Sequence, residues 1–103
     1  MEKIIYTEGF FHDLERIVDF LSEANPPICE ETVNLIYEAI SILGRHPNIG
    51  RPTDSGLKEL LISQGRNGYV ALYRYRQDLR QIRILALRHQ REAGYADDGA
   101  GNH

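Results

Sequence analysis

The sequence predicts an α+β fold of the order β-αα-βββ, in which an N-terminal helix hairpin packs on a small, mainly antiparallel sheet. Apolar residues recur at helical spacing through two consecutive segments of the first half of the chain. In the second half they alternate with polar residues through segments bounded by turn signals. A short β-favouring run precedes the helices and completes the order.

The first strand is expected at residues 3–7, KIIYT, a short run of β-favouring residues. From about residue 9 to residue 24 the apolar positions follow helical spacing instead. The apolar side chains that share one helix face are Phe10, Leu14, Ile17, Val18 and Leu21. Most acidic residues of this segment fall on other faces, which is typical of a helix that covers a core on one side.

An Asn-Pro-Pro segment at residues 25–27 separates this helix from a second one. Asn25 is a candidate N-cap, and proline fits a first helical turn because no backbone donor is needed there. The apolar face of the second helix consists of Val33, Ile36, Ala39, Ile40 and Leu43. Gly44 and Pro47 end the helix. Because the link is so short, the two helices are expected to form an antiparallel hairpin.

Residues 46–57 hold two prolines and two glycines, so they predict a loop. Asn67-Gly68 predicts a hairpin turn between the next two strands, and residues 77–80 form the following turn. The three expected strands are KELLIS (58–63), YVALYRYR (69–76) and QIRILALR (81–88).

Alternation predicts the faces of the last two strands. In the first of them, one face carries Val70, Leu72 and Arg74, and the other carries Tyr69, Ala71, Tyr73 and Tyr75. In the second, Arg83, Leu85 and Leu87 lie opposite Ile82, Ile84 and Ala86. The strand tyrosines are expected to pack against the helix hairpin, although tyrosines interleaved with arginines also resemble a nucleic-acid surface.

The size and composition of the chain indicate one small globular domain over residues 1–95. The polar, Gly-rich residues 96–103 are expected to be a flexible tail. A single cysteine, Cys29, cannot form an internal disulfide and indicates a reducing cytoplasm. The spacing of histidines predicts no metal site, and no nucleotide-binding glycine motif is present. We therefore expect a cytoplasmic protein without a metal, a cofactor or a membrane span.

The net charge of −3 conceals a strong asymmetry. Residues 1–44 carry two basic and nine acidic side chains, a balance of −7. Residues 45–91 carry ten basic and three acidic side chains, a balance of +7. Either the basic half meets a polyanion or an acidic protein, or the two halves neutralise each other within the molecule.

Two groups of residues are candidates for a functional site. His89 could move a proton in phosphodiester cleavage, Arg88 or Arg91 could stabilise the developing charge, and Tyr95 could orient a substrate. The alternative interpretation of His89 is a surface residue that follows a strand. The candidates for binding a target or a nucleic acid are Arg66, Arg74, Arg76, Arg80 and Arg83.

The whole pattern resembles the RelE/ParE superfamily of bacterial toxins over roughly residues 3–95. The order β-αα-βββ carries the resemblance, together with HPNIGRP after the second helix, GLKELLISQGRNGYVALYRY and the ending ILALRHQREAGY. The resemblance implies the toxin half of a type II toxin–antitoxin module. It also implies a hetero-oligomer with a small ParD-like or RelB-like antitoxin encoded beside it.

The superfamily divides by target. RelE-like members are ribosome-dependent mRNA endoribonucleases with a catalytic arginine after the Gly-Tyr pair of the central strand, and Val70 stands at that position here. Their basic or histidine residue after the last strand matches His89, and their C-terminal tyrosine matches Tyr95. ParE-like members poison DNA gyrase, and the apolar central strand is closer to that branch. The resemblance to the ParE-like branch thus implies a gyrase-binding toxin without enzymatic activity. The alternatives are a ribonuclease and a decayed toxin kept for antitoxin binding.

Overall fold

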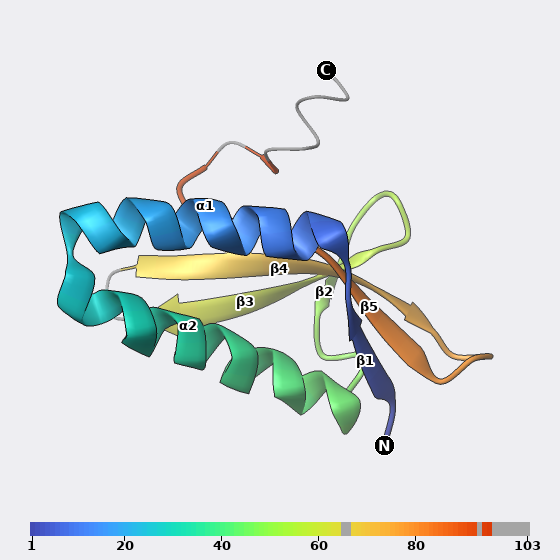
Figure 1. The fold of residues 1–103 in the computed structure, drawn as a ribbon. Coiled ribbons are helices and arrows are strands. Elements are labelled where there is room, and N and C mark those ends of the chain that lie inside the picture. Colours follow the sequence, from blue (N-terminus) through green and yellow to red (C-terminus); the bar gives the residue numbers. More distant parts are fainter. Residues whose placement is uncertain (65–66, 93, 96–103) are drawn as a thin grey trace.

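The structure is a computed structural model that describes residues 1–64, 67–92 and 94–95. In these residues two helices cover one face of a five-stranded sheet (Figure 1). The elements in chain order are β1 (Lys3–Tyr6), α1 (Glu8–Ala24), α2 (Pro26–Ser41), η1 (Ile42–Gly44), β2 (Arg51–Pro52), β3 (Lys58–Gln64), β4 (Asn67–Arg76) and β5 (Gln81–His89). The predicted α+β class and order are confirmed, with one short strand added within the expected loop.

The strands lie in the order β1-β5-β4-β3-β2. β1 runs parallel to β5, and all other neighbouring strands are antiparallel, so the prediction of a mainly antiparallel sheet is confirmed. β2 was missed because it has only two residues, one of which is Pro52 and lacks a backbone donor. It pairs only with the start of β3, so most of the outer edge of β3 has no neighbouring strand among the described residues.

The hairpin between β3 and β4 differs from the prediction. Asn67 and Gly68 belong to β4, where they pair with Gln64 and Ser63. Positions 65–66, between the two strands, lie outside the described residues. The Asn-Gly signal marked the right hairpin, but the expectation that these two residues form its turn is wrong.

The helix hairpin begins with a side-chain cap, because Thr7 Oγ1 accepts a hydrogen bond from the Phe10 N–H at 3.4 Å. At the other end of α1 the Asn25 N–H donates to the Leu21 carbonyl at 2.8 Å. Asn25 also precedes α2, but its side chain makes no capping hydrogen bond, so that expectation is wrong. Pro26 occupies the first turn of α2, as expected.

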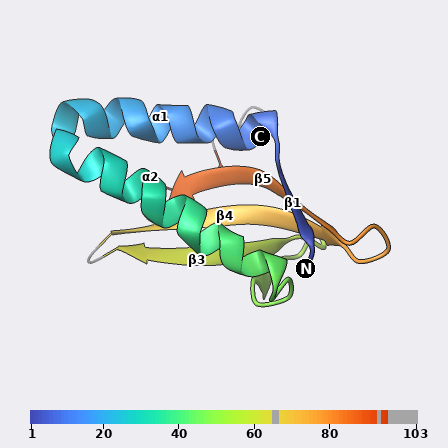
Figure 2. The same cartoon turned by 60° about the horizontal axis from the view of Figure 1, so that its bottom comes forward.

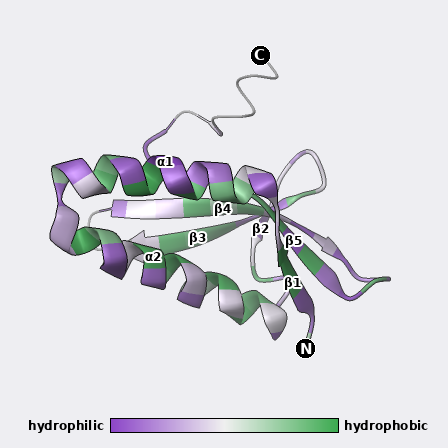
Figure 3. Ribbon diagram, in the orientation of Figure 1, coloured by the Kyte–Doolittle hydropathy of each residue, from purple (hydrophilic) through white to green (hydrophobic). Residues whose placement is uncertain are grey.

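The core lies between the helix hairpin and the covered face of the sheet (Figure 3). Tyr69 and Tyr73 of β4 are buried there, and Tyr75 is half-buried against the same cluster. The expectation that the tyrosines pack against the helices is confirmed. The Tyr73 hydroxyl also donates to the Pro47 carbonyl at 2.8 Å and accepts from the Gly50 N–H at 2.9 Å. It thereby fixes the loop that follows η1.

A β-bulge interrupts β5. Leu72 pairs with Ala86, but the next residue of β4, Tyr73, pairs with Ile84, so Leu85 is an extra residue. Because a bulge adds one residue to the strand, the side chains after it lie on the faces opposite to those that simple alternation predicts. Leu87 consequently lies in the core, on the same side as Ile84. The predicted faces of β5 are therefore wrong after Ile84, because simple alternation contains no extra residue.

Three residues of the β1–α1 region hold this bulge. Thr7 Oγ1 donates to the Ile84 carbonyl at 2.7 Å, and the buried Asp13 Oδ2 accepts from the Leu87 N–H at 2.8 Å. Gly9 lies so close to the strand that an added Cβ would be 2.6 Å from the Leu85 carbonyl oxygen. The helix thus determines where β5 changes its alternation, and hence which faces Arg88 and His89 occupy.

We expect Gly9→Ala to destabilise the protein, although alanine is the better helix former by about 1 kcal/mol. The added methyl group meets backbone, which cannot rotate away, and such overpacking costs about 1–3 kcal/mol. The net loss in the free energy of unfolding, measured by urea denaturation, should be about 1 kcal/mol. Glu15→Ala on the exposed side of α1 is the control. A Gly9→Ala protein as stable as the control would disprove the close approach.

Candidate functional site

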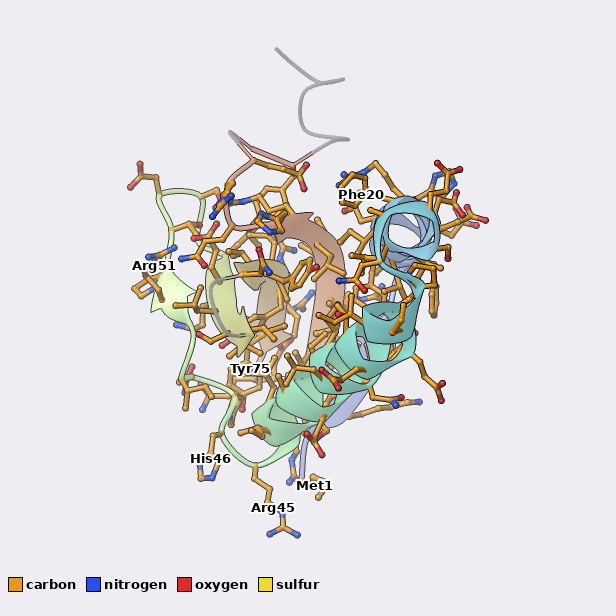
Figure 4. All side chains as sticks on the ribbon, turned by 90° about the vertical axis from the view of Figure 1, so that its left-hand side faces the viewer. Met1, Phe20, Arg45, His46, Arg51 and Tyr75 are labelled. Atoms are coloured by element: carbon orange, nitrogen blue, oxygen red, sulfur yellow. The ribbon has the colours of Figure 1, made fainter. Side chains whose placement is uncertain are left out.

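The two layers of the structure carry opposite charge. The acidic residues 1–44 form mainly the helix layer, and the basic residues 45–91 form most of the sheet. Figure 2 shows both helices on one side of the sheet, and in Figure 4 Arg51 lies on the side away from them. We call that side the helix-free face. From the strand pairing, its charged residues are Lys3, Arg51, Glu59, Arg74, Arg76, Arg83 and Arg88.

A cluster around Glu59 occupies one end of the helix-free face. Arg51 Nη2 donates to Glu59 Oε1 at 2.7 Å, and the Tyr95 hydroxyl donates to Glu59 Oε2 at 2.7 Å. Arg88 Nη2 lies 3.9 Å from the same Oε2, and its guanidinium carbon is 5.1 Å from the centre of the Tyr95 ring. Tyr95 therefore connects β3 with β5 across β4.

Arg88 also organises the chain that leads to Tyr95. Its Nη1 donates to the carbonyls of His89, Gln90 and Glu92 at 3.1–3.3 Å. Only 16% of the Arg88 side chain is exposed. Both Nη atoms thus face protein groups, whereas Nε is buried without a hydrogen-bond partner in the described part of the chain. In this conformation Arg88 holds the C-terminal segment, residues 89–92 and Tyr95, rather than a phosphate.

The electrostatics of the cluster favour a charged Glu59 and a neutral Tyr95. Burial raises the pKa of Glu59, but hydrogen bonds from Arg51 and Tyr95 and the charges of Arg51 and Arg88 outweigh burial and hold that pKa below its ordinary value. Burial and the Glu59 carboxylate together raise the pKa of Tyr95 far above its ordinary value. The Tyr95 hydroxyl therefore keeps its proton at neutral pH and is a poor general base.

The Tyr95→Phe variant should be less stable by about 1 kcal/mol at neutral pH, because a hydrogen bond to a charged acceptor is lost. The pKa of Glu59 is lower in the folded than in the unfolded state, so its contribution is present above the unfolded value near 4.5. That contribution is lost as pH falls through the folded-state pKa. The difference between the two proteins should therefore shrink in acid. Denaturation at several pH values measures the free energy of unfolding of both proteins, with Tyr37→Phe as the control. A difference in this free energy that does not depend on pH would contradict the hydrogen bond from Tyr95 to Glu59.

His89 does not join this cluster. It pairs with Tyr69 on the helix-covered side of the sheet, where the two rings meet edge to face at 5.3 Å. The ring Nδ1 of His89 accepts a hydrogen bond from the Arg91 backbone N–H at 3.0 Å. The backbone N–H of His89 donates to Glu92 Oε1 at 2.7 Å. The four residues considered for a ribonuclease site are thus divided: Arg88 and Tyr95 lie on the helix-free face, whereas His89 and Arg91 line the groove on the helix-covered side.

His89 lines a groove of about 770 Å³ between α1, α2 and the adjacent ends of β4 and β5. Most of its walls are apolar, with contributions from Ile17, Phe20, Leu21 and Ile28. Phe20 is 70% exposed, which is unusual for a large aromatic side chain (Figure 4). The groove is suited to an apolar segment of another protein.

The arginines expected to bind a target differ in whether an acidic side chain pairs with them. Arg76 pairs with Asp78 at 2.9 Å, and Arg80 pairs with Glu2 at 3.0 Å. Arg74 and Arg83 face each other across β4 and β5 and are exposed. Neither of these two has a salt-bridge partner in the described part of the chain. Arg66 lies outside the described residues.

Sequence reasoning missed Glu59 as the centre of the cluster. One sequence feature could have indicated this role: Glu59 is the single acidic residue between positions 55 and 77. A lone carboxylate in a basic strand region suggests an ion-pair centre.

Within the described residues, no group of three or more His, Cys, Asp or Glu side chains could hold a metal ion, and no helix is long and apolar enough to cross a membrane.

Comparison with known proteins now identifies the family. Residues 4–94 match the family described as ParE toxin of type II toxin-antitoxin system, parDE. This chain belongs to the ParE toxin family. The ParE-family chain is also 30% identical over 80 residues to Toxin RelE3 of Caulobacter vibrioides, covering 78% of this chain and 85% of that protein. The predicted resemblance to the RelE/ParE superfamily is thereby confirmed, and the chain is a type II toxin.

Solved structures agree with the fold of the ParE-family chain. The chromosomal ParDE toxin–antitoxin system from P. aeruginosa matches with a TM-score of 0.68 at 23% identity, covering 84% of this chain and 94% of that one. The toxin–antitoxin complex RelBE2 from Mycobacterium tuberculosis matches with a TM-score of 0.58 at 22% identity, covering 86% and 98%. At these identities the likeness concerns the fold alone.

Proposed function

We propose that this ParE-family toxin inhibits growth by binding DNA gyrase in the cytoplasm and poisoning it, without enzymatic activity of its own. The observation that carries the proposal is the division of the ribonuclease candidates between two faces of the sheet. Acid–base cleavage requires the proton-transfer groups to lie within reach of one substrate bond. Val70, at the position of the RelE-like catalytic arginine, is apolar and only 2% exposed.

A stoichiometric toxin needs a binding face rather than a reaction centre. The helix-free face offers one, because its described cations outnumber its single carboxylate, Glu59. Such a surface is attracted to the negatively charged complex of gyrase with DNA. Poisoning would follow if the bound toxin prevents religation of the cut DNA.

The test is a supercoiling assay with purified gyrase, combined with detection of cleaved DNA. We expect supercoiling to stop and broken DNA to accumulate in proportion to added toxin. The His89→Ala protein should act like the unchanged toxin, since His89 lies on the helix-covered side. Gyrase that remains fully active at excess toxin would refute the proposed target.

The alternative is a ribosome-dependent endoribonuclease, which the 30% identity to Toxin RelE3 favours. It predicts that mRNA is cut at the ribosome when the toxin is expressed alone, and that His89→Ala abolishes cutting. Intact transcripts during growth arrest would exclude it. Absence of any growth defect would instead favour a decayed toxin.

We also propose that a ParD-like or RelB-like antitoxin binds this chain and places the apolar side of an amphipathic helix in the groove beside Phe20. The matching ParDE system and RelBE2 complex support a hetero-oligomer of this kind. An exposed apolar groove is the surface that such a helix requires. The part of the outer edge of β3 that has no neighbouring strand among the described residues is suited to an added strand from the same partner.

Phe20→Asp should weaken antitoxin binding at least tenfold, which corresponds to about 1.4 kcal/mol, because a charge replaces an apolar anchor in the groove. The fold should survive, since Phe20 is largely exposed already. Calorimetry with the neighbouring-gene antitoxin measures the affinity. Ile49→Asp introduces the same charge at another exposed apolar position and is the control. Equal affinity of the two variants would exclude the groove.

A further inference from the structure

The helix-free face carries a second charged cluster, in the two rows that follow the row of Glu59, Leu72 and Ala86, and three neighbouring strands assemble it. Arg74 of β4 pairs with Arg83 of β5, and Arg83 pairs on its other side with Ile5 of β1. The next row of the same face consists of Arg76, Gln81 and Lys3. We call the four basic residues of these two rows, Lys3, Arg74, Arg76 and Arg83, the cationic platform.

The charges of the platform are only partly neutralised. Arg76 is paired with Asp78 in the following turn. The other three cations are exposed and have no salt-bridge partner among the residues that the structure describes. Like charges directly opposite each other in a sheet are destabilising. The pair of Arg74 and Arg83 is therefore unfavourable for the isolated fold and becomes favourable only when an anion lies between or above them.

The spacing of the platform suits a repeating anion. Neighbouring strands lie about 4.8 Å apart and successive rows about 6.7 Å apart, so the cations form a regular grid. Arginine offers several donors in a fixed fork that matches phosphate oxygens. Gln81 in the second row adds a neutral hydrogen-bonding side chain between two cations.

The composition of the platform favours a nucleic acid over an acidic protein. Protein–protein interfaces have an apolar centre from which charged residues are depleted. Here the centre is occupied by arginines, and Ile5 is the one apolar residue in the two rows. Interfaces with DNA are more polar and much more positively charged, which agrees with this arrangement.

We propose that the cationic platform binds the phosphates of a DNA duplex. The inference deepens the proposed function, since it rests on action at a gyrase–DNA complex and assigns the DNA contact to this surface. The contact is independent of base sequence, because phosphates carry no sequence information. Lys3 joins the set through the parallel pairing of β1 with β5, and it was not among the residues singled out from the sequence.

The experiment measures binding of the purified toxin to a short fluorescent DNA duplex by anisotropy over a series of salt concentrations. The test protein is the double variant Arg74→Gln/Arg83→Gln. Arg45→Glu is the control, because it removes the same two units of charge from an exposed position outside the platform (Figure 4). Thermal unfolding of all three proteins verifies that each is folded.

The unchanged toxin and the control should bind with a similar salt dependence. In the double variant the slope of log affinity against log salt should be smaller by about 2, since each lost phosphate contact removes about 0.9. Equal slopes for variant and control would overturn the proposal, as would the absence of DNA binding by the unchanged toxin. Preferential binding of RNA over duplex DNA would also overturn it.

A gyrase assay on the same proteins separates the two proposals. If the double variant loses DNA binding and gyrase inhibition together, both are supported. A toxin that binds DNA through the platform but leaves gyrase active supports the platform and refutes the gyrase target. Loss of gyrase inhibition without any change in DNA binding would mean that these arginines contact the gyrase protein, which overturns the platform.

Discussion

Replacing Asp13 by alanine should cost about 3 kcal/mol of the free energy of unfolding, since a buried N–H loses its acceptor and a small cavity opens in the core. Asp13 is only 2% exposed, and its carboxylate holds the Leu87 N–H beside the bulge. Urea denaturation measures the loss. The Leu87 amide should also exchange its hydrogen faster, because it no longer donates to the helix.

Two variants control this result. Asp13→Asn keeps an oxygen acceptor and should cost less than Asp13→Ala, because the backbone bond survives. Asp19→Ala removes a carboxylate from the exposed side of the same helix and should change stability by less than about 0.5 kcal/mol. If Asp13→Ala and Asp19→Ala were equally stable, the carboxylate would not be holding the strand.

Arg88→Met should be destabilising by about 2–3 kcal/mol, since its guanidinium makes several hydrogen bonds that methionine cannot replace. It also lies against the Tyr95 ring and near Glu59, so the C-terminal segment should detach from the sheet in the variant. Methionine keeps an apolar stem of similar length, which limits the loss of packing.

Arg83→Met is a matched control for Arg88→Met. It makes the same substitution on the same strand at an exposed position, and its effect on stability should stay within about 0.5 kcal/mol. Limited proteolysis near the C-terminus should cut the Arg88→Met protein faster than the control. Similar stability and similar cutting of both proteins would show that Arg88 does not hold the segment.

The elements of the fold could be predicted because each has a strong local signal. The helices follow from repeated apolar spacing, and the strands of the second half follow from alternation between turn residues. The bulge could not be predicted in this way. It is held by Thr7, Gly9 and Asp13, which are more than 70 residues away from the strand that they contact, so no local pattern of β5 records it.

The site was predicted in part for the same reason. The arginines of the β4–β5 region were found because they cluster in the sequence, but their state depends on distant partners. Arg80 is neutralised by Glu2 from the other end of the chain. His89 and Arg88 are neighbours in sequence, yet they lie on opposite faces of the sheet, because neighbouring strand residues point in opposite directions.

The parallel pairing of β1 with β5 has a consequence for the synthesis of the toxin. β1 finds its partner only in β5, Gln81–His89, so the sheet of the described residues stays incomplete until β5 has been translated. Contacts between such distant segments form late in folding. A prematurely terminated chain that lacks β5 also lacks Arg83 and the site where Lys3 would dock. The helix-free face is therefore incomplete in such products, and only a chain translated through β5 can assemble it.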